Sequence, residues 1–316
     1  MLSQILLILL GFVLLIKGAD WLVSGSTQLA KKYGVSDLII GLTIVAFGTS
    51  APELIVNTLA SYQDHPEIVF GNVIGSNNFN LFIILGLVGV ILPVSVQSGM
   101  VWKEIPLSFL ATALLLFLAN DWLLGGKPTL SNTDAFLLLL VFGAFLFYMF
   151  RQMKSESAQP ETYSSGSSAK IWLLIGAGLT GLIAGGKLVV DHSVLLAESL
   201  GMSERVIGLT IVAAGTSLPE LVTSVVAALK KNSDIAIGNI IGSNIFNLLL
   251  ILSVSGLISP IPFQPDFNRE IYLLLGGTLF LFLAMFMGKR KKLDRWEAAV
   301  LLLVYLVYTW WLVVEH

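Results

Sequence analysis

The chain has 316 residues, of which 56% are hydrophobic and only 12% charged, and its mean hydropathy is +0.87. Because soluble domains are roughly a quarter charged, this composition excludes a soluble globular protein and indicates an integral membrane protein. The absence of cysteine excludes disulfides and thiolate metal sites. The net charge of −2 excludes no class of membrane protein, so the distribution of the charges matters more than their sum.

Apolar stretches of roughly 20 residues, long enough to cross a bilayer as helices, recur along the whole sequence. The first stretch lacks a basic leader and a cleavage site, so we expect it to be a retained helix. The stretches predict an all-α integral membrane protein with ten transmembrane helices, at about residues 3–29, 37–61, 67–92, 100–119, 131–151, 171–197, 204–229, 235–258, 270–287 and 296–314.

The loops between these spans differ in basic residues. When the loops are assigned alternately to two sides, 13 Lys and Arg residues fall on one side and three on the other. The positive-inside rule predicts that the richer side is cytoplasmic and that both termini are extracytoplasmic. The basic run at 289–292 fits an anchor at the anionic inner lipid surface rather than a nucleic-acid site.

A Ser-rich segment without apolar periodicity divides the chain near its middle. It predicts a cytoplasmic linker at 153–169 between two halves, 1–152 and 170–316, each with five spans. The linker is too short to hold a soluble regulatory domain.

The two halves contain a duplicated segment. Residues 41–80 and 208–247 align without a gap at a constant offset of 167 positions, and 22 of the 40 aligned residues are identical. Because each half has an odd number of spans, the second copy would enter the membrane in the opposite orientation. Inverted repeats of this kind build transporters that have one central site and expose it to each side in turn.

Each copy places one carboxylate inside an otherwise uncharged span. Glu53 is the only charged residue between positions 38 and 63, and Glu220 is the only one between 206 and 229. An ionisable side chain at the centre of a span costs at least about 2.5 kcal/mol and is functional by default. The glutamates are therefore the strongest candidates for a functional site.

Polar side chains at helical spacing accompany the glutamates and line one face of each helix. These faces comprise Thr49, Ser50 and Glu53; Thr216, Ser217 and Glu220; Asn72, Ser76 and Asn80; and Asn239, Ser243 and Asn247. For any single Ser or Thr, simple helix-to-helix bonding remains an equally good interpretation.

Gly48 with Pro52, and Gly215 with Pro219, are positioned to interrupt helical hydrogen bonding and to free main-chain carbonyls. Carboxylate, hydroxyl, amide and carbonyl oxygens are the ligands that Ca2+ and Na+ prefer. Two glutamates would neutralise one Ca2+. We therefore expect broken helices at the centre of the protein that form a cation site.

The motifs GTSAPE with GNVIGSNNFN, and GTSLPE with GNIIGSNIFN, resemble the two alpha repeats of the cation/calcium antiporter superfamily, specifically its sodium/calcium exchanger branch of prokaryotic type. The resemblance covers nearly the whole chain. It implies an antiporter, not an enzyme, that exchanges Na+ for Ca2+ and carries no prosthetic group.

The resemblance also implies roles for individual residues. Glu53, Glu220 and the carbonyls of Thr49 and Thr216 would hold Ca2+, while Asn80 and Asn247 would close the centre. The flanking Na+ sites would comprise Ser50, Ser217, Ser76, Ser243 and the carbonyls of Ala46 and Ala213. Several relatives have Asp at the position of Asn247, so we expect exchange here to be independent of K+.

Two other transport functions remain as alternatives. An H+/Ca2+ antiporter would protonate the glutamates, although the motifs of that branch differ from GTS-PE. A cation channel is disfavoured because two inverted halves in one chain fit a carrier. In addition to Ca2+, Na+ and lipid, the sequence indicates no further partner, leaves the oligomeric state open, and predicts a multi-pass protein of a prokaryotic inner membrane.

Overall fold

The computed structural model describes residues 2–121, 128–156, 167–200, 213–287 and 291–315. Most of the described chain is helical. The predicted linker at 153–169 and the seventh predicted span at 204–229 lie partly outside the described residues.

Helices dominate the first half of the chain, and π-helical segments interrupt two of its spans. The elements are α1 (Leu2–Tyr33), α2 (Asp37–Ile40), π-helical η1 (Gly41–Val45), α3 (Ala46–Thr49), α4 (Ala51–Tyr62), α5 (Pro66–Asn78), π-helical η2 (Phe79–Ile84), α6 (Leu85–Ile91), β1 (Val94–Ser95), α7 (Ser98–Trp102), α8 (Glu104–Ala119), β2 (Thr129–Leu130) and α9 (Asn132–Glu156).

The described part of the second half follows a similar order. Its elements are α10 (Ser168–Ser199), α12 (Ala213–Gly215), α13 (Leu218–Leu229), α14 (Ser233–Phe246), π-helical η4 (Asn247–Ile251), α15 (Leu252–Ile258), β3 (Ile261–Pro262), the 3-10 turn η5 (Pro265–Phe267), α16 (Asn268–Ala284), β4 (Lys292–Leu293) and α17 (Arg295–Glu315).

Many of these helices have the length and composition of membrane spans. Seven described helices pass that test, and the pair Asp37–Thr49 with Ala51–Tyr62, which is bent by 46°, would be an eighth. The apolar helix α13 is shorter. The chain is therefore a multi-pass, mostly helical membrane protein, as the composition predicts.

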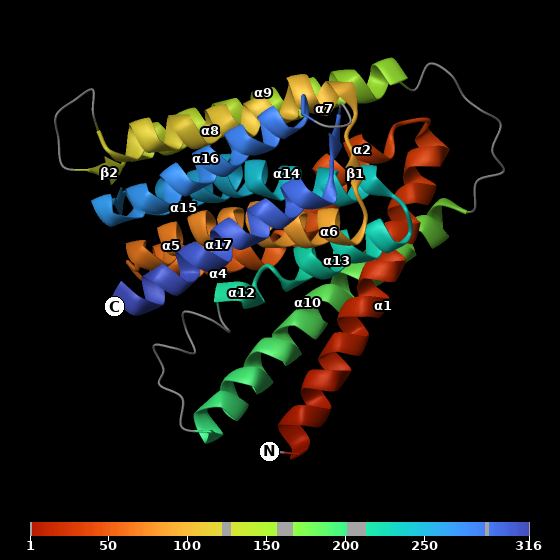
Figure 1. The fold of residues 1–316 in the computed structure, drawn as a ribbon, viewed down its shortest axis with the longest axis horizontal. Helices are drawn as coiled ribbons and strands as arrows, with labels where there is room; N and C mark the ends of the chain where they lie inside the picture. The colour runs from red at the N-terminus through yellow and green to blue at the C-terminus, as the bar shows by residue number, and fades with distance from the viewer. Residues whose placement is uncertain (1, 122–127, 157–166, 201–212, 288–290, 316) are drawn as a thin grey trace.

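The two longest helices, α1 and α10, lie side by side and slant away from the layered stack of the other helices (Figure 1). Their contact requires glycine, because a Cβ atom on Gly18 would lie 2.7 Å from the Gly178 carbonyl oxygen. Small residues that let two backbones approach closely are typical of helix pairs in membranes.

Helix α14 runs through the middle of the stack (Figure 1) and packs against the first broken helix and against α13. Every residue from Ile235 to Phe246 is buried. A helix that is covered on all sides must satisfy its polar side chains within the protein, so its Asn and Ser residues have partners on neighbouring helices.

Two short antiparallel ribbons each join one strand of the first half to one strand of the second. Val94 of β1 pairs with Leu293 of β4, and Leu130 of β2 pairs with Ile261 of β3. The ribbons connect the halves at the ends of their spans.

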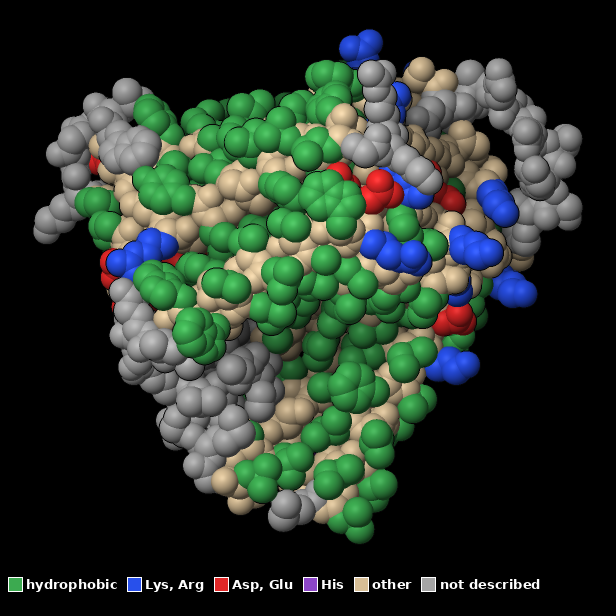
Figure 2. Space-filling model, viewed as in Figure 1, with side chains coloured by type: hydrophobic (Ala, Val, Ile, Leu, Met, Phe, Trp, Pro, Cys, Tyr) green, Lys and Arg blue, Asp and Glu red, His purple; other side chains and the backbone are tan. Residues whose placement is uncertain are grey.

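The outer surface is largely apolar. Figure 2 shows hydrophobic side chains over most of the face in view, with most of the visible Lys and Arg side chains gathered toward one end. Leu173 is 70% exposed and Leu110 is 62% exposed. So much exposed apolar surface fits contact with lipid rather than water.

Candidate cation-binding site

The first half contains a helix that breaks where the sequence predicts it. Helix α3 ends at Thr49, Ser50 has φ −82° and ψ 7°, and α4 begins at Ala51. The helical segments before and after Ser50 are bent by 46°.

The second half repeats this break. Ser217 has φ −86° and ψ 5°, and α13 begins directly after it. Pro52 and Pro219 have no N–H group, so they cannot donate to the carbonyls of Gly48 and Gly215 four residues earlier. Each break therefore exposes main-chain oxygen beside a glutamate.

The two glutamates are buried, and each accepts a hydrogen bond from a serine of the other half. The Ser50 hydroxyl donates to Glu220 Oε1 at 2.9 Å, and the Ser217 hydroxyl donates to Glu53 Oε1 at 3.3 Å. The Ser243 hydroxyl also approaches Glu220 Oε1, at 3.4 Å. The halves thus bring both carboxylates to one place.

Several oxygens around the carboxylates are buried and have no hydrogen-bond partner among the described residues. They are Glu53 Oε2, Glu220 Oε2, Ser76 Oγ, Asn80 Oδ1 and Asn247 Oδ1. Within the described chain, neither carboxylate forms an ion pair with Lys or Arg. Leaving such groups unpaired is costly, so this set of oxygens is suited to a bound cation.

The two threonines take part in matching hydrogen-bond chains between the halves. The chains run from Thr49 to Asn239 (2.9 Å) and on to Ser224 (3.0 Å), and from Thr216 to Asn72 (3.2 Å) and on to Asn57 (2.8 Å). Each hydroxyl therefore donates its proton to an asparagine of the other half, and the main-chain carbonyls of the two threonines remain the predicted ligands.

Ala46 and Ala213 differ in what the structure describes. The Ala46 carbonyl accepts the Ser50 N–H at 3.0 Å and lies 3.3 Å from the Thr49 hydroxyl. An ion at this carbonyl would have to share it with both donors. Ala213 opens α12, but its side chain lies outside the described residues.

The sequence reasoning missed Asn77 and Asn244, which are buried beside the site. Each donates to the main-chain carbonyl of the other at 3.2 Å. Both residues lie in the duplicated GSN sequence, and their identity in the two copies was the signal that could have revealed them.

The donor set fits a hard cation. It consists of two carboxylates and neutral hydroxyl, amide and carbonyl oxygens, whereas Ca2+ takes about six to eight oxygen ligands. No group of three or more His, Cys, Asp or Glu residues suited to a metal occurs among the described residues. Any cation bound here would therefore rely largely on neutral oxygens.

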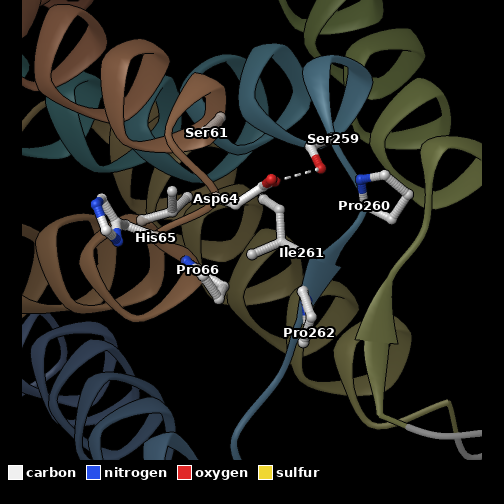
Figure 3. Close-up of a pocket in the computed structure, with 9 residues that line it drawn as sticks. Ser61, Asp64, His65, Pro66, Ser259, Pro260, Ile261 and Pro262 are labelled. Carbon is white, nitrogen blue, oxygen red and sulfur yellow. Dashed lines mark hydrogen bonds between the residues drawn. The ribbon is translucent and has the colours of Figure 1, made fainter.

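A separate cavity of about 240 Å³ lies at the turn between α4 and α5 (Figure 3). The Ser259 hydroxyl donates to the Asp64 carboxylate across it at 3.3 Å. None of the predicted site residues lines this cavity. It is therefore not the predicted cation site.

Comparison with known proteins identifies relatives along the whole chain. The family described as sodium/calcium exchanger protein matches residues 3–151 and 170–314. The chain is 33% identical to the sodium/calcium exchanger MaX1 of Methanosarcina acetivorans, covering 96% of each chain. It is 32% identical to the inner membrane protein YrbG of Escherichia coli, covering 99% of this chain and 98% of that protein.

A solved structure has the same fold. It is the sodium-calcium exchanger NCX_Mj soaked with 10 mM Na+ and zero Ca2+, which superposes with a TM-score of 0.83 at 33% identity and covers 96% of this chain and 97% of its own. With the family match over both halves, this similarity means that the chain is a membrane transporter rather than an enzyme and belongs to the sodium/calcium exchanger family.

Proposed function

We propose that this protein exchanges Na+ for Ca2+ across a prokaryotic inner membrane by alternating access. The observation that carries the proposal is the group of buried, unpartnered oxygens on Glu53, Glu220, Ser76, Asn80 and Asn247. Bound cations would supply the partners that these oxygens lack. Two carboxylates balance one Ca2+, and Na+ uses the same kinds of oxygen.

The proposed Ca2+ ligands are Glu53 and Glu220 with the carbonyls of Thr49 and Thr216. Ser50, Ser217, Ser76, Ser243, Ala46 and Ala213 would serve Na+, and Asn80 and Asn247 would close the centre. The crossed contacts Ser50–Glu220 and Ser217–Glu53 support this set, because each carboxylate already has an oxygen of the other half beside it.

We further propose ten spans in two inverted halves, 1–152 and 170–316. Helix α17 and the broken helix that ends in α13 would complete the count. The hydrogen bonds between the halves support this symmetry: Ser50–Glu220 becomes Ser217–Glu53 when each residue is replaced by its equivalent at the offset of 167. One strand of each β-ribbon also follows this offset, since Val94 of β1 corresponds to Ile261 of β3.

Charge balance leads to two finer proposals. If three Na+ exchange for one Ca2+, the loaded site carries one net positive charge with Na+ and none with Ca2+, so transport is electrogenic. With neutral Asn at both closing positions, an additional K+ would remain uncompensated where charge is expensive. Exchange should therefore not require K+.

Ca2+ uptake into proteoliposomes tests this function. An outward Na+ gradient should drive uptake in the absence of K+, and clamping the membrane potential should change the rate. An outward H+ gradient of the same size should drive little uptake. Uptake that follows the H+ gradient and ignores Na+ would overturn the proposal and favour an H+/Ca2+ antiporter.

A further inference from the structure

Four buried asparagines form a crossed arrangement between the two halves, at the ends of α5 and α14 where the π-helical segments begin. The bonds are Asn77 Nδ2 to the Asn244 carbonyl (3.2 Å), Asn244 Nδ2 to the Asn77 carbonyl (3.2 Å), Asn247 Nδ2 to Asn77 Oδ1 (2.9 Å) and Asn80 Nδ2 to Asn244 Oδ1 (3.1 Å).

The main chain fixes the direction of the first amide. Asn77 Nδ2 faces the carbonyl oxygen of Asn244, which can only accept a hydrogen bond. Turning the Asn77 amide over would place two acceptors against each other. Its Oδ1 must therefore face the other way, and the same argument fixes the amide of Asn244.

These fixed amides dictate the orientation of the next pair. Asn77 Oδ1 needs a donor, which selects the orientation of Asn247 with Nδ2 toward it. The remaining oxygen, Asn247 Oδ1, is buried and has no partner among the described residues. In the same way, Asn244 Oδ1 accepts a hydrogen bond from Asn80 Nδ2. This orientation leaves Asn80 Oδ1 buried and without a partner among the described residues.

We propose that Asn77 and Asn244 are positioning residues that hold the oxygens of Asn247 and Asn80 ready for a cation. This inference rests on the proposed function, because it takes Asn80 and Asn247 as ligands. An amide attracts a cation only through its oxygen, whereas its NH2 group repels one. Fixing the orientation in advance removes an ordering cost from cation binding.

The crossed hydrogen bonds between the two halves make a distinctive prediction. Asn77 acts on Asn247, which is 170 residues away in the chain, and not on Asn80, which is three residues away. Asn244 acts on Asn80 and not on Asn247. A residue that merely supported the fold would show no such crossed preference.

Double-mutant cycles test whether these asparagine pairs are coupled in Ca2+ binding. The Ca2+ affinity of the purified full chain is measured by calorimetry or by Ca2+-dependent thermal stabilisation. Asn77→Ala should weaken Ca2+ binding about three- to tenfold. In the Asn247→Ala background the same change should have less than about a twofold further effect. In the matched Asn80→Ala background its effect should remain complete. Asn244→Ala should likewise lose its effect in the Asn80→Ala background and keep it in the Asn247→Ala background.

Equal coupling of Asn77 to Asn247 and to Asn80, or none to either, would overturn the inference while leaving the proposed function intact. Absence of Ca2+ binding by the wild-type protein would contradict both. If Asn77→Ala does not fold, Asn77→Ser keeps a polar group at this buried position and enters the same cycle with the same expected pattern.

Discussion

At the scale of single residues, the central feature is two buried carboxylates that have no basic partner among the described residues. A carboxylate and a unit positive charge about 4 Å away attract each other by about 4 kcal/mol at an effective dielectric constant of 20. Either glutamate could therefore contribute on the order of a thousandfold to Ca2+ affinity. The site depends on both charges.

We expect Glu53→Gln and Glu220→Gln each to abolish or severely reduce Na+-driven Ca2+ uptake without unfolding the protein. Gln keeps the shape and an acceptor oxygen for the serine of the other half, but it removes the charge. Uptake into proteoliposomes and size-exclusion chromatography measure the two effects. Glu67→Gln is the matched control, since Glu67 is exposed in the first turn of α5 and accepts a hydrogen bond from Gln264.

Near-normal uptake by either site variant, with the Glu67 control also active, would refute the assignment of the carboxylates.

Asn247→Asp should alter cation selectivity or make uptake more sensitive to pH, because an added carboxylate binds protons and raises the negative charge. The structure adds an electrostatic reason, since an acceptor oxygen would replace the donor Nδ2 at 2.9 Å from Asn77 Oδ1, and a protonated Asp would relieve this repulsion. Uptake measured with Na+, K+ and pH varied in turn tests this. A variant that is less stable but has unchanged ion dependence would show that Asn247 only joins helices.

At the scale of elements, the helix breaks depend on proline. Pro52→Ala restores an N–H donor to the Gly48 carbonyl and should let α3 continue into α4. We expect uptake to fall while thermal stability stays equal or rises. Pro66→Ala is a matched control because Pro66 opens α5, where its missing N–H costs nothing.

Unchanged uptake in Pro52→Ala would mean that the break is not needed for transport. Loss of uptake in Pro66→Ala as well would point to a general sensitivity to proline rather than to the break.

Local chemistry explains which elements could be predicted from the sequence. Apolar length predicts the spans, and Pro52 and Pro219 predict the breaks, because both signals depend on neighbouring residues alone. The π-helical segments at Asn80 and Asn247 could not be predicted, since nothing in their local composition requires an extra residue per turn. The hydrogen bond between Asn77 and Asn247 depends on how the two halves pack against each other, so a local sequence pattern could not predict it.

At the scale of the whole molecule, the uneven distribution of Lys and Arg predicts the orientation in the membrane. The chain has no cysteine, so single cysteines can report accessibility. Exposed positions at His65, Lys154 and Lys291 serve this purpose. Lys154→Cys and Lys291→Cys should react with an impermeant thiol reagent from the cytoplasmic side, and His65→Cys from the outside.

The reverse pattern of labelling would place both termini in the cytoplasm and would overturn the predicted topology.

The location of a bound divalent cation is the most direct test of a single site shared by the two halves. Anomalous diffraction from crystals grown with Ca2+ would measure it. We predict one peak about 2.3–2.6 Å from carboxylate oxygens of both Glu53 and Glu220. A peak bound by only one half, or one in the cavity beside Asp64 with none at the glutamates, would contradict the account.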